Sequence, residues 1–126
     1  MKYSPGRRKR EFMRIRQPKD GNCFYHSISF LLKHHDYCIM SHDKIRERVA
    51  LYFQHKKQME TSRRVRKSQT WAENEEVMAV SNIFNITVKV WEGVNNMWIT
   101  FGKRKRKMIY LYNPENIHFD ALVTCL

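Results

Sequence analysis

The residue best suited to covalent chemistry in this sequence is Cys23, which follows the turn-forming residues Asp20, Gly21 and Asn22. A helix N-terminus carries unpaired N–H groups and a partial positive charge, which lower the pKa of a thiol placed there. Gly21 permits a backbone geometry that a side chain would forbid. The backbone N–H groups from Asp20 to Cys23 could stabilise an oxyanion. The pattern suits a cysteine nucleophile, but this segment by itself more often indicates a buried cysteine after an ordinary turn.

Two residues near the end of the chain could complete a site for nucleophilic catalysis. His118 and Asp120 are two positions apart in an expected strand, so their side chains leave the same face about 7 Å apart. The carboxylate can then hold one imidazole nitrogen while the other nitrogen takes the proton of a thiol. A His-x-Asp pair is common by itself, but its combination with a cysteine at a helix start indicates a cysteine protease. Asp20 is the alternative to Asp120, although its position suits shaping the loop better.

The elements that must position these residues begin with three predicted helices. Apolar residues after the candidate nucleophile recur at i, i+4, i+7 and i+8, and the pattern ends near residues 33–36. Ser41 is a good N-cap for a second helix, and Thr70 with Glu73 forms a capping box that opens a third. Residues 56–69 are polar and basic, so we expect a surface connection. The apolar positions of the helices are Phe24, Ile28, Leu31 and Leu32, then Ile45, Val49, Tyr52 and Phe53, then Val77, Val80 and Phe84.

Alternating apolar residues replace the helical period in the second half of the chain. Residues 86–90, 98–101, 108–112 and 118–123 are predicted to form strands. Gly102 and the basic run after it are expected to form a hairpin connection between the second and third of these strands. Helices followed by consecutive strands predict an α+β domain, with helices packed on a small, mostly antiparallel sheet.

Positive charge is concentrated in three parts of this chain, whose net charge is +12. Residues 1–19 hold eight Lys or Arg against one Glu, and residues 63–67 and 103–107 form two further clusters. Such charge favours nucleic acid or acidic surfaces, although the clusters lack the interleaved aromatic residues of a base-stacking surface. A nucleic-acid-binding module is therefore one alternative function, and solvated loops are the other interpretation. Residues 1–16, too basic and too weakly alternating for a convincing strand, are predicted to be a tail or an edge segment.

Length, apolar content and cysteine number limit the class of protein further. The 126 residues, 42% of them apolar, are enough for one packed domain. No apolar run approaches the ~20 residues needed to cross a bilayer, and the basic N-terminus lacks the apolar stretch of a secretory signal. The cysteines Cys23, Cys38 and Cys125 are odd in number and lack metal-site spacing, which disfavours a disulfide framework or a zinc site. We expect an intracellular protein in a reducing compartment, the cytoplasm or the nucleus.

Three stretches of the sequence together resemble the ovarian-tumour (OTU) family of cysteine proteases, which are deubiquitinases. Residues 20–28 (DGNCFYHSI) match the family's nucleophile motif D-G-N-C-[LF]-[FY]-x-[SA]-[IL] throughout. Residues 71–90, where a Trp and an acidic residue open a helix that runs into a strand, resemble its middle block. Residues 117–122 (IHFDAL) resemble its histidine block, H-[YF]-[DN]. The residues of the nucleophile motif and the compact length of the chain are most similar to those of viral members of the family.

The resemblance implies a fold, an activity and roles for particular residues. Residues 17–126 would form an OTU-like catalytic domain with the papain-related fold, which hydrolyses isopeptide bonds at the C-terminus of ubiquitin or a ubiquitin-like modifier. Cys23 would be the nucleophile, His118 the base and later the acid, and Asp120 the orienting group. Asp20 is often counted with the catalytic residues, and the loop from Asp20 to Cys23 would supply the oxyanion hole. No cofactor or metal is implied, and the expected state is a monomer without membrane contact. An inactive relative that binds ubiquitin is the remaining alternative.

Overall fold

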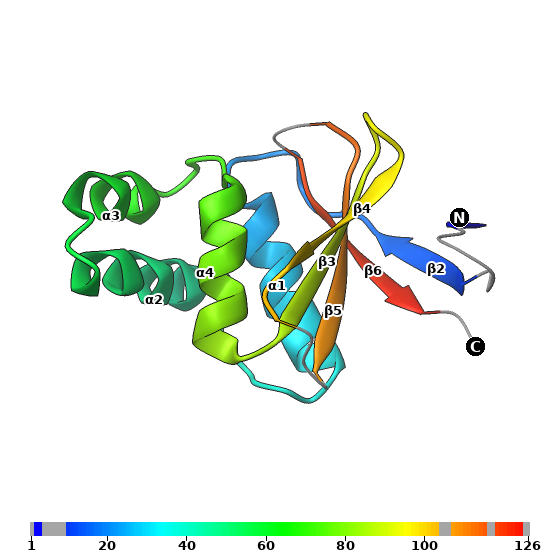
Figure 1. Cartoon of the computed structure of the whole chain (residues 1–126), viewed down its shortest axis with the longest axis horizontal. Helices are drawn as coiled ribbons and strands as arrows, with labels where there is room; N and C mark the ends of the chain where they lie inside the picture. Colours follow the sequence, from blue (N-terminus) through cyan, green and yellow to red (C-terminus); the bar gives the residue numbers. More distant parts are fainter. Residues whose placement is uncertain (1, 4–9, 104–106, 116–117, 125–126) are drawn as a thin grey trace.

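The computed structural model describes residues 2–3, 10–103, 107–115 and 118–124 of the chain. Within these residues, four helices and six strands follow one another along the chain (Figure 1). They are β1 (Lys2–Tyr3), β2 (Arg10–Ile15), α1 (Cys23–His34), α2 (His42–His55), α3 (Met59–Arg66), α4 (Asn74–Phe84), β3 (Thr87–Glu92), β4 (Met97–Phe101), β5 (Met108–Asn113) and β6 (Asp120–Thr124). Among the described residues, no helix is long and apolar enough to span a bilayer.

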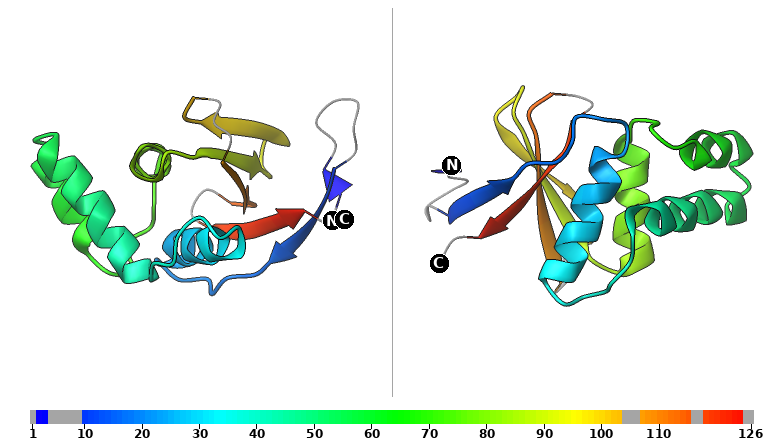
Figure 2. Two further views of the ribbon diagram at one scale, coloured as in Figure 1. Left: turned by 90° about the horizontal axis from the view of Figure 1, so that it is seen from below. Right: turned by 180° about the vertical axis from the view of Figure 1, so that it is seen from behind.

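The strands form one sheet in the order β1-β2-β6-β5-β3-β4. Only the pairing of β3 with β5 is parallel among the pairs described, and the others are antiparallel. α1 contacts β6 and β5, and α4 contacts β3 and β4. α2 and α3 pack on each other and project from the side of the molecule away from β2 (Figures 1 and 2). The predicted α+β class with a mostly antiparallel sheet is confirmed.

The main core lies between these helices and the sheet, and it includes the beginning of α1. The buried face of α1 is formed by Cys23, Phe24, Tyr25, Ser27, Ile28, Leu31 and Leu32. The predicted apolar stripe is therefore the face that the helix buries, because residues at i, i+4, i+7 and i+8 share one side of a helix. Burial of this face fixes the orientation of α1, and with it the place where Cys23 enters the fold.

The strand β2 corrects the expectation that residues 1–16 contain no convincing strand. Residues 10–15 form β2, and its residues 12–15 pair with β6, from Phe12 opposite Thr124 to Ile15 opposite Ala121. Phe12 is the fully buried residue of β2, and its ring packs against Tyr110 with the centroids 4.9 Å apart. Met13 is apolar but exposed, whereas Ile15 packs partly against the main core, so apolar and polar residue types do not alternate along β2 in the sequence.

Three further expectations about the elements are wrong. Residues 59–66 form the helix α3 inside the predicted surface connection; its buried residues are Ser62 and Val65, too few to produce an apolar stripe. The fourth helix begins at Asn74 rather than after Thr70, and the backbone N–H of Glu73 donates to the Glu76 carboxylate at 2.6 Å.

The third correction concerns the strand connections. β4 and β5 are not joined as a hairpin, because both pair with β3 and lie on opposite sides of it. Gly102, with φ of +88°, ends β4 next to α4 instead, where an added Cβ would lie 2.0 Å from Ser81 Oγ. A parallel pair needs a crossover connection, and here the β4 strand supplies part of it.

Candidate active site

Cys23 is the first residue of α1 and is almost completely buried, with 1% of its surface exposed. The turn before it is closed by two hydrogen bonds to Asp20. The Cys23 N–H donates to the Asp20 carbonyl at 3.2 Å, and the Asn22 N–H donates to the Asp20 carboxylate at 2.9 Å. The predicted placement of the cysteine at a turn-capped helix start is confirmed. Asp20 shapes this turn through its own backbone and side chain.

Gly21 is required here by a close approach to another part of the chain, not by its φ angle. A Cβ added to Gly21 would lie 1.5 Å from the carbonyl oxygen of Gln69. Gln69 is in the left-handed region, with φ of +70°, which a non-glycine residue adopts at an energetic cost. The side-chain oxygen of Gln69 accepts the Gly21 N–H at 3.3 Å, and the backbone N–H of Gln69 donates to Asn22 Oδ1 at 3.0 Å. The nucleophile loop is thus packed against the segment before α4.

Arg46 also holds the nucleophile loop, together with the segment around residues 65–70. This residue of α2 is buried, and Nη2 of its guanidinium donates to the Gly21 carbonyl at 3.0 Å and to Asn22 Oδ1 at 2.8 Å. The guanidinium also bonds the carbonyl oxygens of Val65, Lys67 and Thr70. A buried cation is stable only when hydrogen-bonded in this way. Arg46 was not predicted from the sequence to take part in the site. The available indication of its burial was its position next to Ile45, a predicted buried residue of the same helix.

His118 and Asp120 form the second half of the site. His118 Nε2 lies 2.9 Å from Asp120 Oδ1, and both side chains are buried. His118 lies just before β6 rather than in it, so the prediction that both residues belong to one strand is wrong for His118. The two side chains nevertheless meet directly. Asp20, the alternative acidic residue, is hydrogen-bonded within its own turn.

Asp120 is held by residues that were not predicted to take part. Its Oδ2 accepts a hydrogen bond from Nε of Arg14 at 2.6 Å, and its Oδ1 accepts the Gln17 N–H at 2.7 Å. Arg14 belongs to β2, the strand that the sequence did not reveal. The side chain of Asn113 donates to the His118 carbonyl at 2.6 Å and fixes the backbone before β6. These contacts hold the Asp120 carboxylate in place from β2 and from the segment that follows it.

The two halves meet at Phe119. Its backbone N–H donates to the Cys23 sulfur at 3.3 Å, and its ring packs on Phe24 with the centroids 5.2 Å apart. The Ser27 hydroxyl lies 2.8 Å from the Cys23 carbonyl and 3.3 Å from the Phe119 carbonyl, which links α1 to the same segment. In the part of the chain that the structure describes, Nδ1 of His118 is buried without a hydrogen-bond partner. One imidazole nitrogen is therefore engaged by Asp120 while the other is available for a proton.

The protonation state of the thiol differs from the expectation drawn from the helix terminus. Burial is the largest influence, and it raises the pKa of Cys23 above 9.0; the backbone hydrogen bonds from Phe119 and Phe24 act in the opposite direction but do not compensate. Desolvation disfavours the charged form of any group. The thiol is accordingly neutral near pH 7, so a neighbouring base has to remove its proton before it can attack.

Each backbone N–H of the candidate oxyanion loop has an intramolecular acceptor. Asp20 N–H donates to Pro18, and Asn22 N–H to the Asp20 carboxylate, both at 2.9 Å. The bonds from Gly21 and Cys23 are longer, at 3.3 and 3.2 Å. Because longer hydrogen bonds are weaker, the N–H groups of Gly21 and Cys23 are the easiest to redirect towards an oxyanion.

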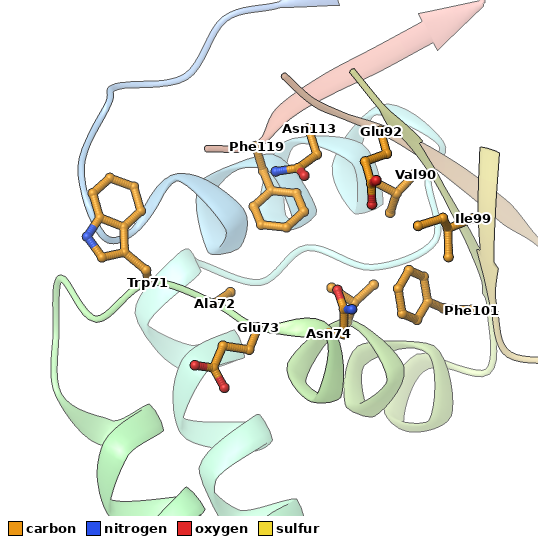
Figure 3. Close-up of a pocket in the computed structure, with 11 residues that line it drawn as sticks. Trp71, Ala72, Glu73, Asn74, Val90, Glu92, Ile99, Phe101, Asn113 and Phe119 are labelled. Atoms are coloured by element: carbon orange, nitrogen blue, oxygen red, sulfur yellow. The ribbon is translucent and has the colours of Figure 1, made fainter. Parts of the chain in front are cut away.

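A pocket of about 360 Å³ lies next to this site (Figure 3). Trp71 stands at one end beside the segment that leads into α1, Ile99 and Phe101 of β4 stand at the other, and Phe119 and Asn113 lie between them. Its charged lining residues are Glu73 and Glu92. Within the described residues, no group of three or more His, Cys, Asp or Glu side chains could hold a metal ion.

Cys23 is a buried thiol at a helix start, and it is hydrogen-bonded to Phe119, the residue that follows the histidine paired with Asp120. This arrangement is that of a cysteine protease. The family model described as OTU-like cysteine protease matches residues 18–119. This chain therefore belongs to the OTU-like cysteine protease family. A search of curated proteins found no matching relative.

Solved structures share the fold at low sequence identity. An ovarian tumor (OTU) domain in complex with ubiquitin superimposes with a TM-score of 0.78 at 15% identity, over 90% of this chain and 70% of that one. The Hazara virus OTU bound to ubiquitin gives 0.73 at 23% identity, over 91% and 82%. An OTU deubiquitinase from Wolbachia pipientis wMel bound to ubiquitin gives 0.74 at 13% identity, over 90% and 96%. The predicted OTU fold is confirmed.

Proposed function

We propose that this protein is a deubiquitinating cysteine protease, with Cys23 as nucleophile, His118 as base and acid, and Asp120 as the orienting residue. The observation that carries the proposal is the meeting of the two halves at Phe119, whose N–H reaches the Cys23 sulfur while the adjacent His118 is paired with Asp120. Family membership and ubiquitin-bound structures of the same fold support ubiquitin as the substrate.

The reaction follows from these positions. His118 takes the Cys23 proton, and the sulfur attacks the carbonyl carbon of the isopeptide bond. The oxyanion is held by N–H groups of the loop from Asp20 to Cys23, for which Gly21 and Cys23 are the best candidates. His118 then gives its proton to the lysine amine as the C–N bond breaks. A water molecule, deprotonated by His118, attacks the thioester and releases the carboxylate and the thiol.

Asp120 and Asp20 take different parts in this proposal. Asp120 stabilises the imidazolium that forms during both steps, since it lies 2.9 Å from His118 Nε2. Asp20 fixes the turn before the nucleophile, because both of its hydrogen bonds to this turn lie within residues 20–23. We also propose that the enzyme acts as a monomer in a reducing compartment, where the Cys23 thiol stays usable.

Cleavage of linkage-defined diubiquitins by the purified chain tests the proposal. We expect the wild type to release monoubiquitin from at least one linkage, and Cys23→Ala to release none while keeping its circular dichroism spectrum. Cys38→Ala is a matched control, because it removes a thiol outside the site, and it should cleave as the wild type does. A wild-type protein inactive on every linkage, or an active Cys23→Ala variant, would contradict the proposed function.

A further inference from the structure

A second cavity, of about 470 Å³, opens beside His118 and is basic. It is lined by Arg14, Arg16, Lys19, Trp71, Glu115 and His118. Arg14 is committed to Asp120, whereas Arg16 and Lys19 are exposed cations on the segment between β2 and α1. With Glu115 as the acidic group of this lining, positive charge predominates.

The basic cavity and the pocket of Figure 3 have opposite charge and share a wall. Trp71 lines both of them. The pocket of Figure 3 carries Glu73 and Glu92, and no Lys or Arg is among the described residues that line it. A substrate that spans the site therefore meets an acidic surface on one side of Trp71 and a basic surface on the other.

The chemistry of the proposed function assigns a substrate half to each side. The leaving lysine amine must receive its proton from His118, so the amine and its neighbours lie beside the imidazole. His118 lines the basic cavity and not the acidic pocket. The modifier's C-terminal segment is the acyl half and enters from the other side. The residues that flank the acceptor lysine are thus the part of the substrate that faces Arg16 and Lys19.

We propose that the basic cavity selects acceptor lysines flanked by acidic residues, and that Arg16 and Lys19 are the specificity-determining side chains. The inference rests on the proposed function and specifies its substrate class. It gives a role to part of the basic N-terminal segment without invoking nucleic acid. Exposed ion pairs are weak and screened by salt, so the selection is a preference and not an absolute requirement.

Three substrates test this preference directly. Ubiquitin is joined through its C-terminus to the lysine side chain of a labelled peptide, with Asp, Ser or Arg residues on both sides of that lysine. We expect the wild type to cleave the Asp-flanked substrate with a kcat/KM about fivefold above the Ser-flanked one and to cleave the Arg-flanked one most slowly. The preference should shrink as the ionic strength rises from about 0.05 to about 0.5 M.

Charge variants locate the preference. In the double variant Arg16→Gln, Lys19→Gln, kcat/KM should become equal for the Asp- and Ser-flanked substrates. In Arg16→Glu, Lys19→Glu the Ser-flanked substrate should be cleaved with the higher kcat/KM. Arg48→Glu, Arg63→Glu makes the same change of charge at exposed residues of α2 and α3, which do not line the cavity, and should keep the wild-type ratio. If this control variant lost the preference for the Asp-flanked substrate as fully as the Arg16 and Lys19 variants do, the effect would be one of general charge and the inference would be overturned.

The failure of the inference differs from the failure of the proposed function. A wild type that hydrolyses ubiquitin joined to a small fluorophore, yet shows no acidic preference, would overturn the selection by Arg16 and Lys19 alone. A wild type that hydrolyses neither this substrate nor any of the three conjugates would overturn the proposed function, and the inference with it.

Discussion

The two halves of the candidate site are held in place by different means. The nucleophile loop lies outside the sheet and is fixed by side chains from distant parts of the chain, chiefly Arg46 and Gln69. The histidine segment leads directly into β6, which pairs with β2 on one side and β5 on the other. One half therefore depends on a few polar contacts, and the other on a central strand.

This difference indicates where the site is sensitive to substitution. Arg46 bonds the loop at Gly21 and Asn22 and also bonds three carbonyl groups around residues 65–70, so one side chain holds the loop and its neighbour together. Asp120 has three separate partners on its carboxylate, and its backbone belongs to the sheet. Loss of one peripheral contact should therefore disturb the nucleophile half more than the histidine half.

The largest effect is expected from a change to the central residue of the histidine half. Asp120→Asn keeps the shape of the side chain but removes the charge that stabilises the imidazolium, so kcat should fall by roughly a thousandfold. Hydrolysis of ubiquitin joined to a fluorophore measures it, with thermal unfolding as the check on folding. Asp20→Asn is the matched comparison and should fall by roughly tenfold or less, since Asp20 acts within its turn. An equal loss in both variants would contradict the assignment of Asp120.

Arg46→Met tests the nucleophile half, and we expect kcat to fall by roughly a hundredfold with little change in KM. The variant leaves the Gly21 carbonyl without its guanidinium partner, while Asn22 Oδ1 keeps only the Gln69 N–H, and an unsatisfied buried acceptor costs about 1–3 kcal/mol. Arg46→Lys should recover part of kcat, because an ammonium can satisfy some but not all of these acceptors. Arg48→Met, an exposed change on the same helix, is the control. A raised KM with an unchanged kcat would contradict a positioning role.

Removal of the peripheral contact on the histidine half should have a smaller effect. Arg14→Gln deletes the ion pair with Asp120 Oδ2, while Gln17 and the sheet still hold the carboxylate. We expect kcat to fall by roughly tenfold, less than in Arg46→Met, because Arg14 is partly exposed. Steady-state kinetics of the two variants side by side measure the comparison. A loss in Arg14→Gln larger than that in Arg46→Met would reverse our interpretation of the two halves.

The titration of the Cys23 thiol is expected to depend on the burial of the nucleophile half. Burial raises the pKa of Cys23 above 9.0, so the thiolate forms only as the pH rises through that raised value. In His118→Ala, where no imidazole can take the proton, alkylation of Cys23 by iodoacetamide should be slow at pH 7 and accelerate above pH 9. The alkylation rate of Cys23, followed by mass spectrometry between pH 6 and 10.5, tests this expectation. An alkylation rate that already reaches its plateau below pH 8 would contradict it.

The sequence predicted those parts of the site that depend on local patterns. The turn before Cys23, the helix after it and the proximity of His118 to Asp120 each follow from residues close together in the chain. Arg46, Gln69 and Arg14 were missed because each acts on a residue at least 24 positions away. No local pattern encodes such a contact.

The fold was predicted to a similar extent, and the errors have related causes. β2 buries Phe12 fully and Ile15 in part but exposes Met13, and α3 buries Ser62 and Val65 as its only described buried residues, so neither produces a recognisable period. The order of β3, β4 and β5 depends on which strand β3 pairs with on each side, and alternation within a strand is the same for parallel and antiparallel neighbours. The raised thiol pKa was missed because burial outweighs the helix terminus.

Covalent labelling by a ubiquitin derivative with an electrophilic C-terminus tests the central proposal most directly. We expect one equivalent of the probe to be attached to Cys23 in the wild type, as located by peptide mass spectrometry, and none in Cys23→Ala. Labelling of Cys38→Ala should equal that of the wild type. Attachment to Cys38 or Cys125, or no labelling of a folded wild-type protein, would contradict the assignment of Cys23 as the nucleophile of a deubiquitinase.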